Sequence, residues 1–393
     1  MSSLIYPALL IIAFFIPLNE GITYVGALLL LIAFLGGAIK PRRTVLDIPI
    51  IILLASLGLS TVFSVNPLLS LQALGIFAIS MLAFYYFPVW TDISHEKNRW
   101  IFLTIAVACI LVSFLGILQL FFGPNLLSLY HTGPHYCGRN LRIFSTLFDP
   151  DVLSEYLIFI LPLTITLFLA GRDFRERLIG ILAFSVGTPC VYLTYSRAGW
   201  FGFLVSFISL SLLLKKKRLL LILLAFLILG FFIFPSFFSK RLLHSLSLSD
   251  LLSAEPRTLV WREAVKLLLE RPIFGFGLFT FDEAVIARSS LSTAYPPNLF
   301  LTFLFETGIL GLLGFVYLLV VICRNALKCI MDYRDRFETR IAAGIMAGLF
   351  GYIATEQFHA SLRIANMRIL FFFLIGMLVK IVQSLREKTE ISG

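Results

Sequence analysis

The sequence predicts an all-α polytopic membrane protein with about twelve transmembrane helices and a large loop that carries amphipathic helices. Of its 393 residues, 59% are hydrophobic and only 14% are charged, and the mean hydropathy is +0.96. A soluble domain exposes too much surface to water for this mixture. Apolar segments also recur along the whole chain, and each is long enough, or nearly so, to cross a bilayer.

Twelve apolar segments account for most of the chain. The first lacks a basic start and a small-residue cleavage site, so we expect it to be retained as a span. The predicted segments are 4–18, 21–39, 46–65, 68–88, 100–122, 152–170, 178–195, 198–214, 219–235, 298–322, 341–358 and 366–383. They divide the chain into four regions: the first five helices (1–122), a motif-bearing loop with helices six to nine (123–235), a long loop with an amphipathic helix (236–297), and the last three helices with a tail (298–393).

Basic residues concentrate in alternate connections. One side of the predicted bundle, the C-terminal tail included, carries 20 of the 32 Lys and Arg residues in short segments. By the positive-inside rule this side is cytoplasmic, and so are both termini. The rule accounts for the net charge of +10 without a nucleic-acid partner. No Walker or dinucleotide motif is present, and the five scattered cysteines predict neither a disulfide framework nor a metal site.

A single cation separates the seventh and eighth apolar segments. Arg197 stands in Tyr195-Ser196-Arg197-Ala198-Gly199-Trp200, on the outward side. Placing arginine at full bilayer depth costs about 2.5–3.5 kcal/mol on insertion scales. The side chain therefore either extends to the lipid headgroups or holds an anion.

The long outward loop contains an amphipathic helix after Glu255. Pro256 suits the first helical position, and Pro272 ends the helix. Apolar residues recur at helical spacing, which favours a helix lying on the outer leaflet. Its basic residues form either a solvated face or anion ligands. Further on, Glu306 lies two turns inside the tenth segment, where a carboxylate must be paired, protonated or functional.

Taken together, these motifs resemble the O-antigen ligase and O-antigen polymerase superfamily of membrane glycan transferases. Each motif alone is loose, but their order and spacing match over about 140–310. The matching pieces are Arg142-Ile143-Phe144-Ser145-Thr146-Leu147-Phe148-Asp149-Pro150-Asp151, Ser196-Arg197-Ala198-Gly199-Trp200, Arg257-Thr258-Leu259-Val260-Trp261, Arg271-Pro272-Ile273-Phe274-Gly275-Phe276-Gly277, Asn298-Leu299-Phe300-Leu301 and Glu306-Thr307-Gly308.

The resemblance implies a donor glycan on undecaprenyl diphosphate in the bacterial inner membrane, used at the periplasmic face. The acceptor would be a lipid A-core sugar, another glycan or a protein hydroxyl. Arg197 and Arg257 would hold the donor diphosphate, with Arg142 as a further contact. Guanidinium groups suit this role because they pair bidentately with phosphate oxygens and stay charged when desolvated. No metal, cofactor or nucleic acid is expected.

The acceptor half of the predicted site departs from the family pattern. The ligases carry a histidine before the asparagine of their His-Asn-x-x-Leu motif, and this chain has Pro297, which cannot accept a proton. His359 and Glu306 are the two candidate catalytic bases. Other outward candidates are His131, His135, His244 and Asp282, and the residues expected to line the acceptor side are Trp261, Arg262, Tyr295 and Asn298. By residue type alone, Trp261 suits the interfacial aromatic belt better than a sugar-stacking role.

The predicted function is therefore an inverting, metal-independent glycan transfer from undecaprenyl diphosphate. We place the ligase first and the polymerase a close second, since Pro297 weakens the ligase match. A secondary transporter of anionic lipid-linked substrates is the rival from another class, although internal repeats are absent from the sequence. A non-catalytic scaffold for envelope assembly is the third alternative.

Overall fold

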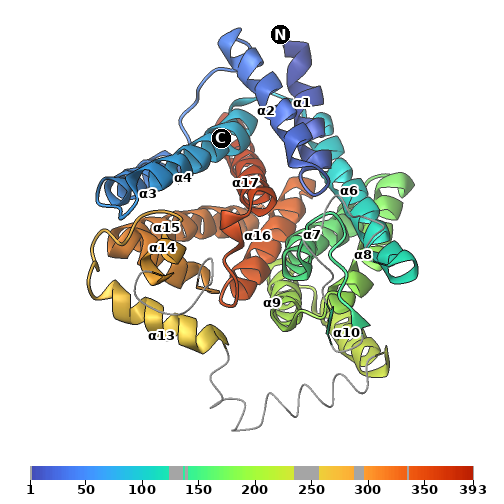
Figure 1. Cartoon of the computed structure of the whole chain (residues 1–393). Coiled ribbons are helices and arrows are strands. Elements are labelled where there is room, and N and C mark those ends of the chain that lie inside the picture. Colours follow the sequence, from blue (N-terminus) through green and yellow to red (C-terminus); the bar gives the residue numbers. More distant parts are fainter. Residues whose placement is uncertain are drawn as a thin grey trace.

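The computed structural model describes residues 2–123, 136–137, 140–233, 256–286, 296–333 and 336–392. These residues form a bundle of long helices (Figure 1). The sheet in this part of the chain is one short antiparallel hairpin, β1 (Tyr136–Cys137) with β2 (Asn140–Leu141). The predicted all-α membrane class is confirmed.

Every predicted apolar segment coincides with a helix or a continuous helical run. The fourth run consists of α4 (Pro67–Ser80), the π-helical η1 (Met81–Tyr86) and α5 (Phe87–Trp90). The remaining long helices are α1 (Ser2–Phe15), α2 (Glu20–Leu35), α3 (Asp47–Val62), α6 (His95–Phe122), α7 (Pro150–Ala170), α8 (Phe174–Leu193), α9 (Arg197–Leu214), α10 (Leu220–Ile233), α15 (Leu299–Asp332), α16 (Phe337–Thr355) and α17 (Ala365–Ser392). Shorter elements are η3 (Lys217–Leu219), α13 (Pro256–Leu268), α14 (Phe281–Ile286) and η4 (Ser361–Arg363).

Within the described residues, seven helical segments are long and apolar enough to cross a bilayer, judged by length and composition. They are 67–90, 95–122, 150–170, 174–193, 197–214, 299–332 and 365–387. Three shorter apolar helices, α1, α2 and α3, accompany them. Lipid provides no partners for backbone polar groups, which is why apolar segments of this kind fold as helices.

Two helices form the centre of the bundle. In α7 and in α17, 89% of the most apolar window is buried inside the protein. Helix α16 packs against both α7 and α9. Glycines allow the close approach: a Cβ on Gly348 would lie 2.2 Å from the Phe159 carbonyl oxygen, and one on Gly202 would lie 2.8 Å from the Gly351 carbonyl oxygen. Small residues at helix contacts are typical of membrane bundles.

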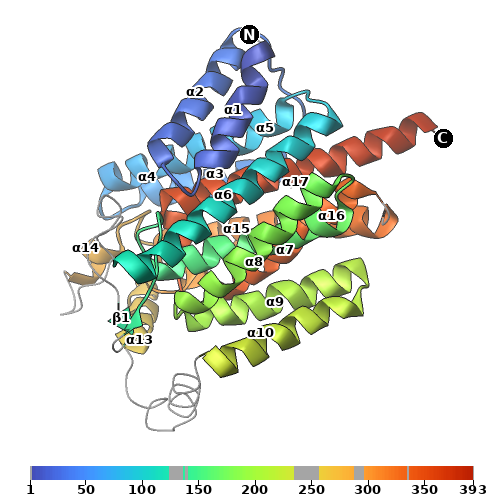
Figure 2. The same cartoon turned by 90° about the vertical axis from the view of Figure 1, so that its right-hand side faces the viewer.

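The bundle has two chemically different ends (Figure 2). At one end the basic connections contact one another: Arg99 pairs with Glu176, His95 with Glu338, and Arg340 donates to the Leu169 carbonyl. Helices α13 and α14, hairpin β1–β2 and the motif-bearing turns gather at the other end. The separation matches the two sides predicted from charge.

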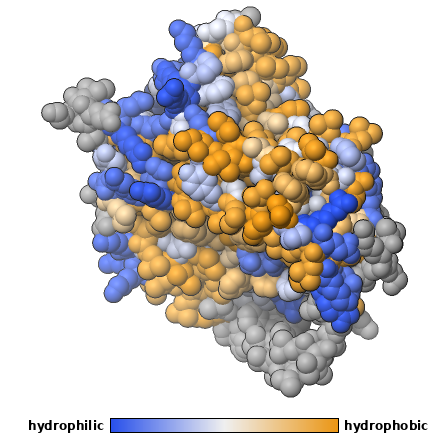
Figure 3. Space-filling view, turned by 90° about the vertical axis from the view of Figure 1, so that its left-hand side faces the viewer, coloured by the Kyte–Doolittle hydropathy of each residue, from blue (hydrophilic) through white to orange (hydrophobic). Residues whose placement is uncertain are grey.

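Apolar side chains cover the surface between these ends. On the face shown in Figure 3 they form a broad hydrophobic area with hydrophilic residues toward its margins. Exposed aliphatic residues occur along α3, α4 and α15, including Ile48, Ile51, Leu68, Leu71 and Leu313. Such a surface is stable against lipid and costly against water. The protein is therefore a multi-pass membrane protein.

Candidate functional site

The N-terminal end of α7 connects two of the predicted motifs. Arg142 donates from Nε to the Thr194 carbonyl oxygen at 2.7 Å and from Nη2 to Asp151 Oδ1 at 2.9 Å. Thr194 is the C-cap of α8, and Asp151 lies in the first turn of α7. Asp149 is the N-cap of α7, and its side chain accepts from the Asp151 N–H at 2.6 Å. Arg142 thus holds the turn before Arg197 against α7.

Arg197 is the first residue of α9. Its neighbour Ser196 is the N-cap and accepts from the Gly199 N–H at 3.1 Å. The Arg197 side chain is exposed. A helix N-terminus presents unpaired N–H groups and a partial positive charge, so it favours anions. Helix start and guanidinium therefore attract the same kind of ligand.

Gly199 explains why this helix starts so close to α7. A Cβ at this position would lie 2.7 Å from Ser154 Oγ, one turn from Asp151. Further along α9, the ring of Phe201 meets that of Phe358 with 6.5 Å between centroids. The starts of α7 and α9 and the turn after α16 are therefore neighbours.

A histidine and a glutamate of that turn form a cluster with a buried glutamate of α7. His359 Nδ1 lies 2.8 Å from Glu155 Oε1, and the side chains are 15% and 2% exposed. The fully buried Glu356 accepts from the Ser361 N–H at 3.0 Å and from the Ser361 hydroxyl at 2.5 Å. One ligand-type atom from each of His359, Glu155 and Glu356 lies within 4.8 Å of the others. Glu155 Oε2 has no hydrogen-bond partner among the described residues.

Asn298 connects this turn to α15. Its side chain caps the helix by accepting from the Leu301 N–H at 2.9 Å, and its Nδ2 donates to the Gln357 carbonyl at 3.0 Å. The Leu299 N–H donates to the Glu356 carbonyl at 2.8 Å. Pro297 stands immediately before the cap. In this structure Asn298 therefore positions the turn that carries His359.

Glu306, the second candidate base, forms a buried ion pair. Its Oε1 accepts from Arg363 Nη1 at 2.8 Å, and the two side chains are 4% and 16% exposed. The Arg363 guanidinium also lies over the Phe279 ring, 4.5 Å from its centroid. Asp282 of α14 is close to this cation: burial raises the pKa of its carboxyl above the ordinary value, and the charge of Arg363 opposes that shift.

Breaking this ion pair should destabilise the protein. We expect Arg363→Ala to cost about 3–5 kcal/mol, because it leaves the Glu306 carboxylate buried without its cation. Thermal unfolding in detergent measures the loss as a lower Tm. Replacing both residues by leucine should recover part of it. An unchanged Tm in Arg363→Ala would contradict the assigned pairing.

Two glycine-containing motifs, Arg271–Gly277 and Glu306–Gly308, form backbone hydrogen bonds with each other. The Phe276 and Gly277 N–H groups donate to the carbonyls of Phe305 and Glu306, at 3.0 and 2.8 Å. Ile309 N–H donates to the Pro272 carbonyl at 2.9 Å. Helix α15 is broken at Gly308, which has φ 64° and ψ −169°. The break releases these carbonyls from the helical pattern and places Glu306 beside the loop.

Helix α13 begins as predicted, and it ends at Leu268. Its buried residues Val260, Ala264 and Leu267 pack against α14 and Phe305, so this face meets protein, whereas the sequence indicated a lipid surface. Leu269, just after the helix, is 77% exposed, as an interfacial position would be.

The residues predicted to line the acceptor side differ in burial and in contacts, and some of them lie outside the described part of the chain. The buried indole N–H of Trp261 has no partner among the described residues. Arg262 is exposed, 3.8 Å from Glu263. Arg257 lies in the first turn of α13, but its side chain is outside the described part of the chain. Tyr295, His131, His135 and His244 also lie outside it.

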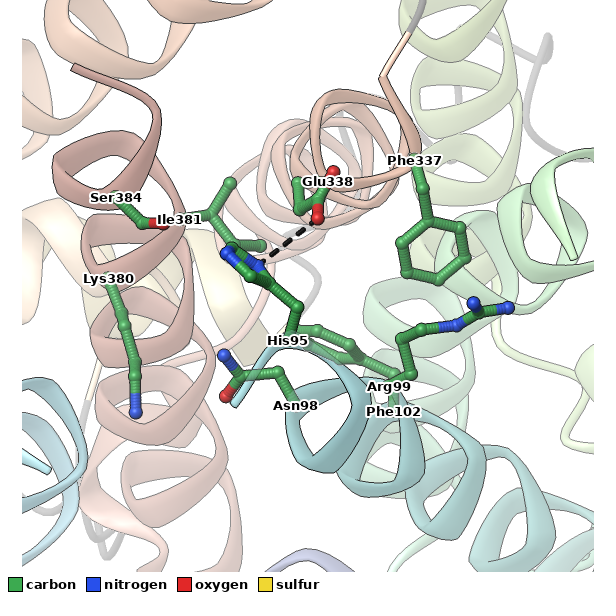
Figure 4. Close-up of a pocket in the computed structure, with 9 residues that line it drawn as sticks. All are labelled: His95, Asn98, Arg99, Phe102, Phe337, Glu338, Lys380, Ile381 and Ser384. Atoms are coloured by element: carbon green, nitrogen blue, oxygen red, sulfur yellow. Dashed lines mark ion pairs between the residues drawn. The ribbon is translucent and has the colours of Figure 1, made fainter. Parts of the chain in front are cut away.

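A small cavity lies at the opposite, basic end (Figure 4). It is lined by His95, Asn98, Arg99, Phe102, Phe337, Glu338, Lys380, Ile381 and Ser384. Its charged groups already have partners: His95 is 3.2 Å from Glu338, and Lys380 Nζ donates to Thr91 Oγ1 at 2.8 Å. None of the predicted site residues lines it.

Comparison with known protein families gives one partial match. Residues 180–316, about a third of the chain, match the family model described as O-Antigen ligase. This partial match supports the O-antigen ligase superfamily for the stretch from α8 into α15. No curated protein matches the chain.

The O-antigen ligase match extends from α8 into α15 and contains Arg197, Asn298 and Glu306. Arg142, Glu155 and His359 lie outside it and join the site through the fold. Sequence reasoning missed Glu155. A usable signal was present, because a carboxylate in a predicted membrane segment is costly unless it is paired.

Proposed function

We propose that this protein acts as a member of the O-antigen ligase superfamily and transfers a glycan from undecaprenyl diphosphate to an acceptor hydroxyl. A lipid A-core sugar is the favoured acceptor. The acceptor oxygen attacks the anomeric carbon from the face opposite the diphosphate and inverts the configuration. The anomeric C–O bond breaks, its electron pair stays on undecaprenyl diphosphate, and the hydroxyl proton passes to a base on the protein.

The placement of Arg197 carries this proposal. It is an exposed guanidinium at the start of α9, beside the Arg142-bound turn. A departing diphosphate gains negative charge in the transition state, and preorganised donors at that point are an effective form of catalysis. Arg197, Arg257 and Arg142 are the proposed donor ligands, and Trp261, Arg262, Tyr295 and Asn298 the proposed acceptor side.

His359 is the proposed base. The neighbouring carboxylate of Glu155 and the closed turn around Ser361 support this choice, because a base needs a fixed orientation. Glu306 is the second candidate, but its carboxyl group already pairs with Arg363, which fits a structural role. Because Pro297 replaces the histidine of the ligase motif, glycan polymerisation by a member of the same superfamily is the alternative reaction.

The proposed orientation puts the motif-bearing end in the periplasm. The opposite end carries the basic connections, which the positive-inside rule assigns to the cytoplasm of an inner-membrane protein. Cysteine labelling from outside intact spheroplasts tests this. A cysteine near Phe201 should react, and one near Arg340 should react only after lysis.

Reaction products distinguish the candidate functions. Purified protein is mixed with undecaprenyl-diphosphate-linked glycan and with lipid A-core. Glycosylated lipid A-core identifies a ligase, and a ladder of lengthened lipid-linked glycan identifies a polymerase. Absence of both products, without release of undecaprenyl diphosphate, would overturn the proposal in favour of a transporter or a scaffold.

Arg257 can be tested against a matched cation on the same helix. We expect Arg257→Ala to lower kcat/KM by about 10²-fold or more, because one charge-assisted contact to the diphosphate is lost. Lys266→Ala is the control, since Lys266 is exposed and pairs with Glu263 at 2.7 Å. Equal activity in the two variants would remove Arg257 from the donor site.

A further inference from the structure

The strongest unassigned feature is the buried carboxylate of Glu155 against the His359 ring. Glu155 lies in the second turn of α7, four residues after Asp151 and therefore on the same helix face. Asp151 holds Arg142, and Glu155 faces His359 Nδ1 at 2.8 Å. One helix face thus contacts both the proposed donor side and the proposed base.

The contact between Glu155 and His359 determines the state of the imidazole. With a carboxylate at Nδ1, the neutral ring carries its proton there, and Nε2 is the nitrogen with the basic lone pair. The carboxylate also stabilises the imidazolium that forms when Nε2 takes up a proton. A nucleophile, a base and an orienting carboxylate form a recurring catalytic arrangement.

The backbone of His359 is held as well. Glu356 closes the turn by accepting from both the N–H and the hydroxyl of Ser361, and the Tyr352 and Ser361 hydroxyls are 2.9 Å apart. Asn298 ties the same turn to α15 through the Gln357 carbonyl. The ring is therefore oriented from α7 while its backbone is fixed from α15 and α16.

We propose that Glu155 is a positioning residue for this transferase: it holds His359 so that Nε2 accepts the proton of the acceptor hydroxyl. This inference rests on the proposed function. As the acceptor oxygen bonds to the anomeric carbon, its proton passes to Nε2, the electron pair of the broken C–O bond leaves with undecaprenyl diphosphate, and Glu155 stays ionised beside the imidazolium.

The test compares His359→Gln, Glu155→Gln and the double variant in the purified transferase. We expect His359→Gln to lower kcat by about 10²- to 10⁴-fold, the usual contribution of a general base. Glu155→Gln should lower kcat by about 10- to 100-fold and leave KM for the lipid-linked donor within about twofold. The double variant should be no slower than His359→Gln, because Glu155 acts only through the histidine.

Two controls separate positioning from folding. Glu155→Asp should recover part of kcat, since it restores a carboxylate on a shorter arm. Glu176→Gln removes a partly buried, ion-paired carboxylate at the other end of the bundle and should leave kcat unchanged. Unaltered kcat in Glu155→Gln, or effects of the two single changes that multiply in the double variant, would overturn the assignment.

Failure of this inference is distinguishable from failure of the proposed function. If His359→Gln and Glu155→Gln both transfer glycan at the original rate while Arg197→Ala does not, the donor site stands and the base lies elsewhere. If all three variants, like the unaltered protein, give no transfer product, the proposed function itself is wrong.

Discussion

Arg197→Ala is expected to lower kcat/KM for glycan transfer by about 10³-fold. The guanidinium stands at the start of α9, where helix N–H groups already favour an anion, so under the proposed function its loss removes a strong donor to the leaving diphosphate. Release of undecaprenyl diphosphate, followed over time with lipid-linked glycan and acceptor, measures the loss. Donor binding should weaken in the same variant.

Two further substitutions identify the cause of that loss. Arg197→Lys keeps the charge but not the bidentate geometry, so it should recover only a small part of the rate. Arg42→Ala removes an exposed arginine, paired with Asp92 at 3.4 Å, from the other end of the bundle, and should leave the rate unchanged. If Arg197→Ala folds and releases undecaprenyl diphosphate at the original rate, Arg197 does not hold the donor.

Most of the fold could be predicted from the sequence because the bilayer restricts the alternatives. An apolar segment in lipid has to satisfy its own backbone, which leaves the helix as the solution. Each of the twelve predicted segments accordingly coincides with a helical run. Packing could not be predicted in this way, since lipid-facing and protein-facing surfaces are equally apolar. Nothing in the hydropathy of α7 indicated that it lies at the centre of the bundle.

The proposed site was predictable only in part. Arg197 and Arg142 lie in motifs, and the structure places both beside the same turn. The partner of His359 could not be read from a local pattern, because Glu155 is 204 residues away in the chain. A carboxylate in an apolar segment is costly unless it is paired, and this holds for Glu155 as it does for Glu306. This cost makes Glu155 a candidate from the sequence, but it does not identify His359 as its partner.

The glycine motifs form a backbone contact whose partner the sequence likewise does not identify. Gly275 and Gly277 permit close approach of another group because they lack a Cβ, and the sequence does not say which group that is. The structure identifies it as the break in α15: a Cβ on Gly275 would lie 2.5 Å from the Glu306 carbonyl oxygen. Two motifs that are separate in sequence are therefore the two halves of one backbone contact, which holds Glu306 next to the proposed site.

Gly308→Ala should be the most destabilising single-methyl change at this contact. Gly308 combines φ 64° with ψ −169°, a conformation open almost only to glycine, and a Cβ there would lie 2.1 Å from the Ile273 carbonyl oxygen. Strain and overpacking each cost roughly 1–3 kcal/mol, so we expect a loss of about 4 kcal/mol. Thermal unfolding in detergent should show a much lower Tm or little folded protein.

Substitutions at two other glycines distinguish the cost of backbone strain from the cost of overpacking. Gly37 has φ 74° with no atom within 4 Å of an added Cβ, so Gly37→Ala carries the conformational cost alone, about 1–2 kcal/mol. Gly75 lies within α4 with the same open space, and Gly75→Ala should be neutral or stabilising because alanine favours helix. If Gly308→Ala costs no more than Gly37→Ala, the loop 272–277 yields to the added methyl group, and the contact does not hold Glu306 rigidly. A larger loss means that this backbone contact is a fixed part of the proposed site.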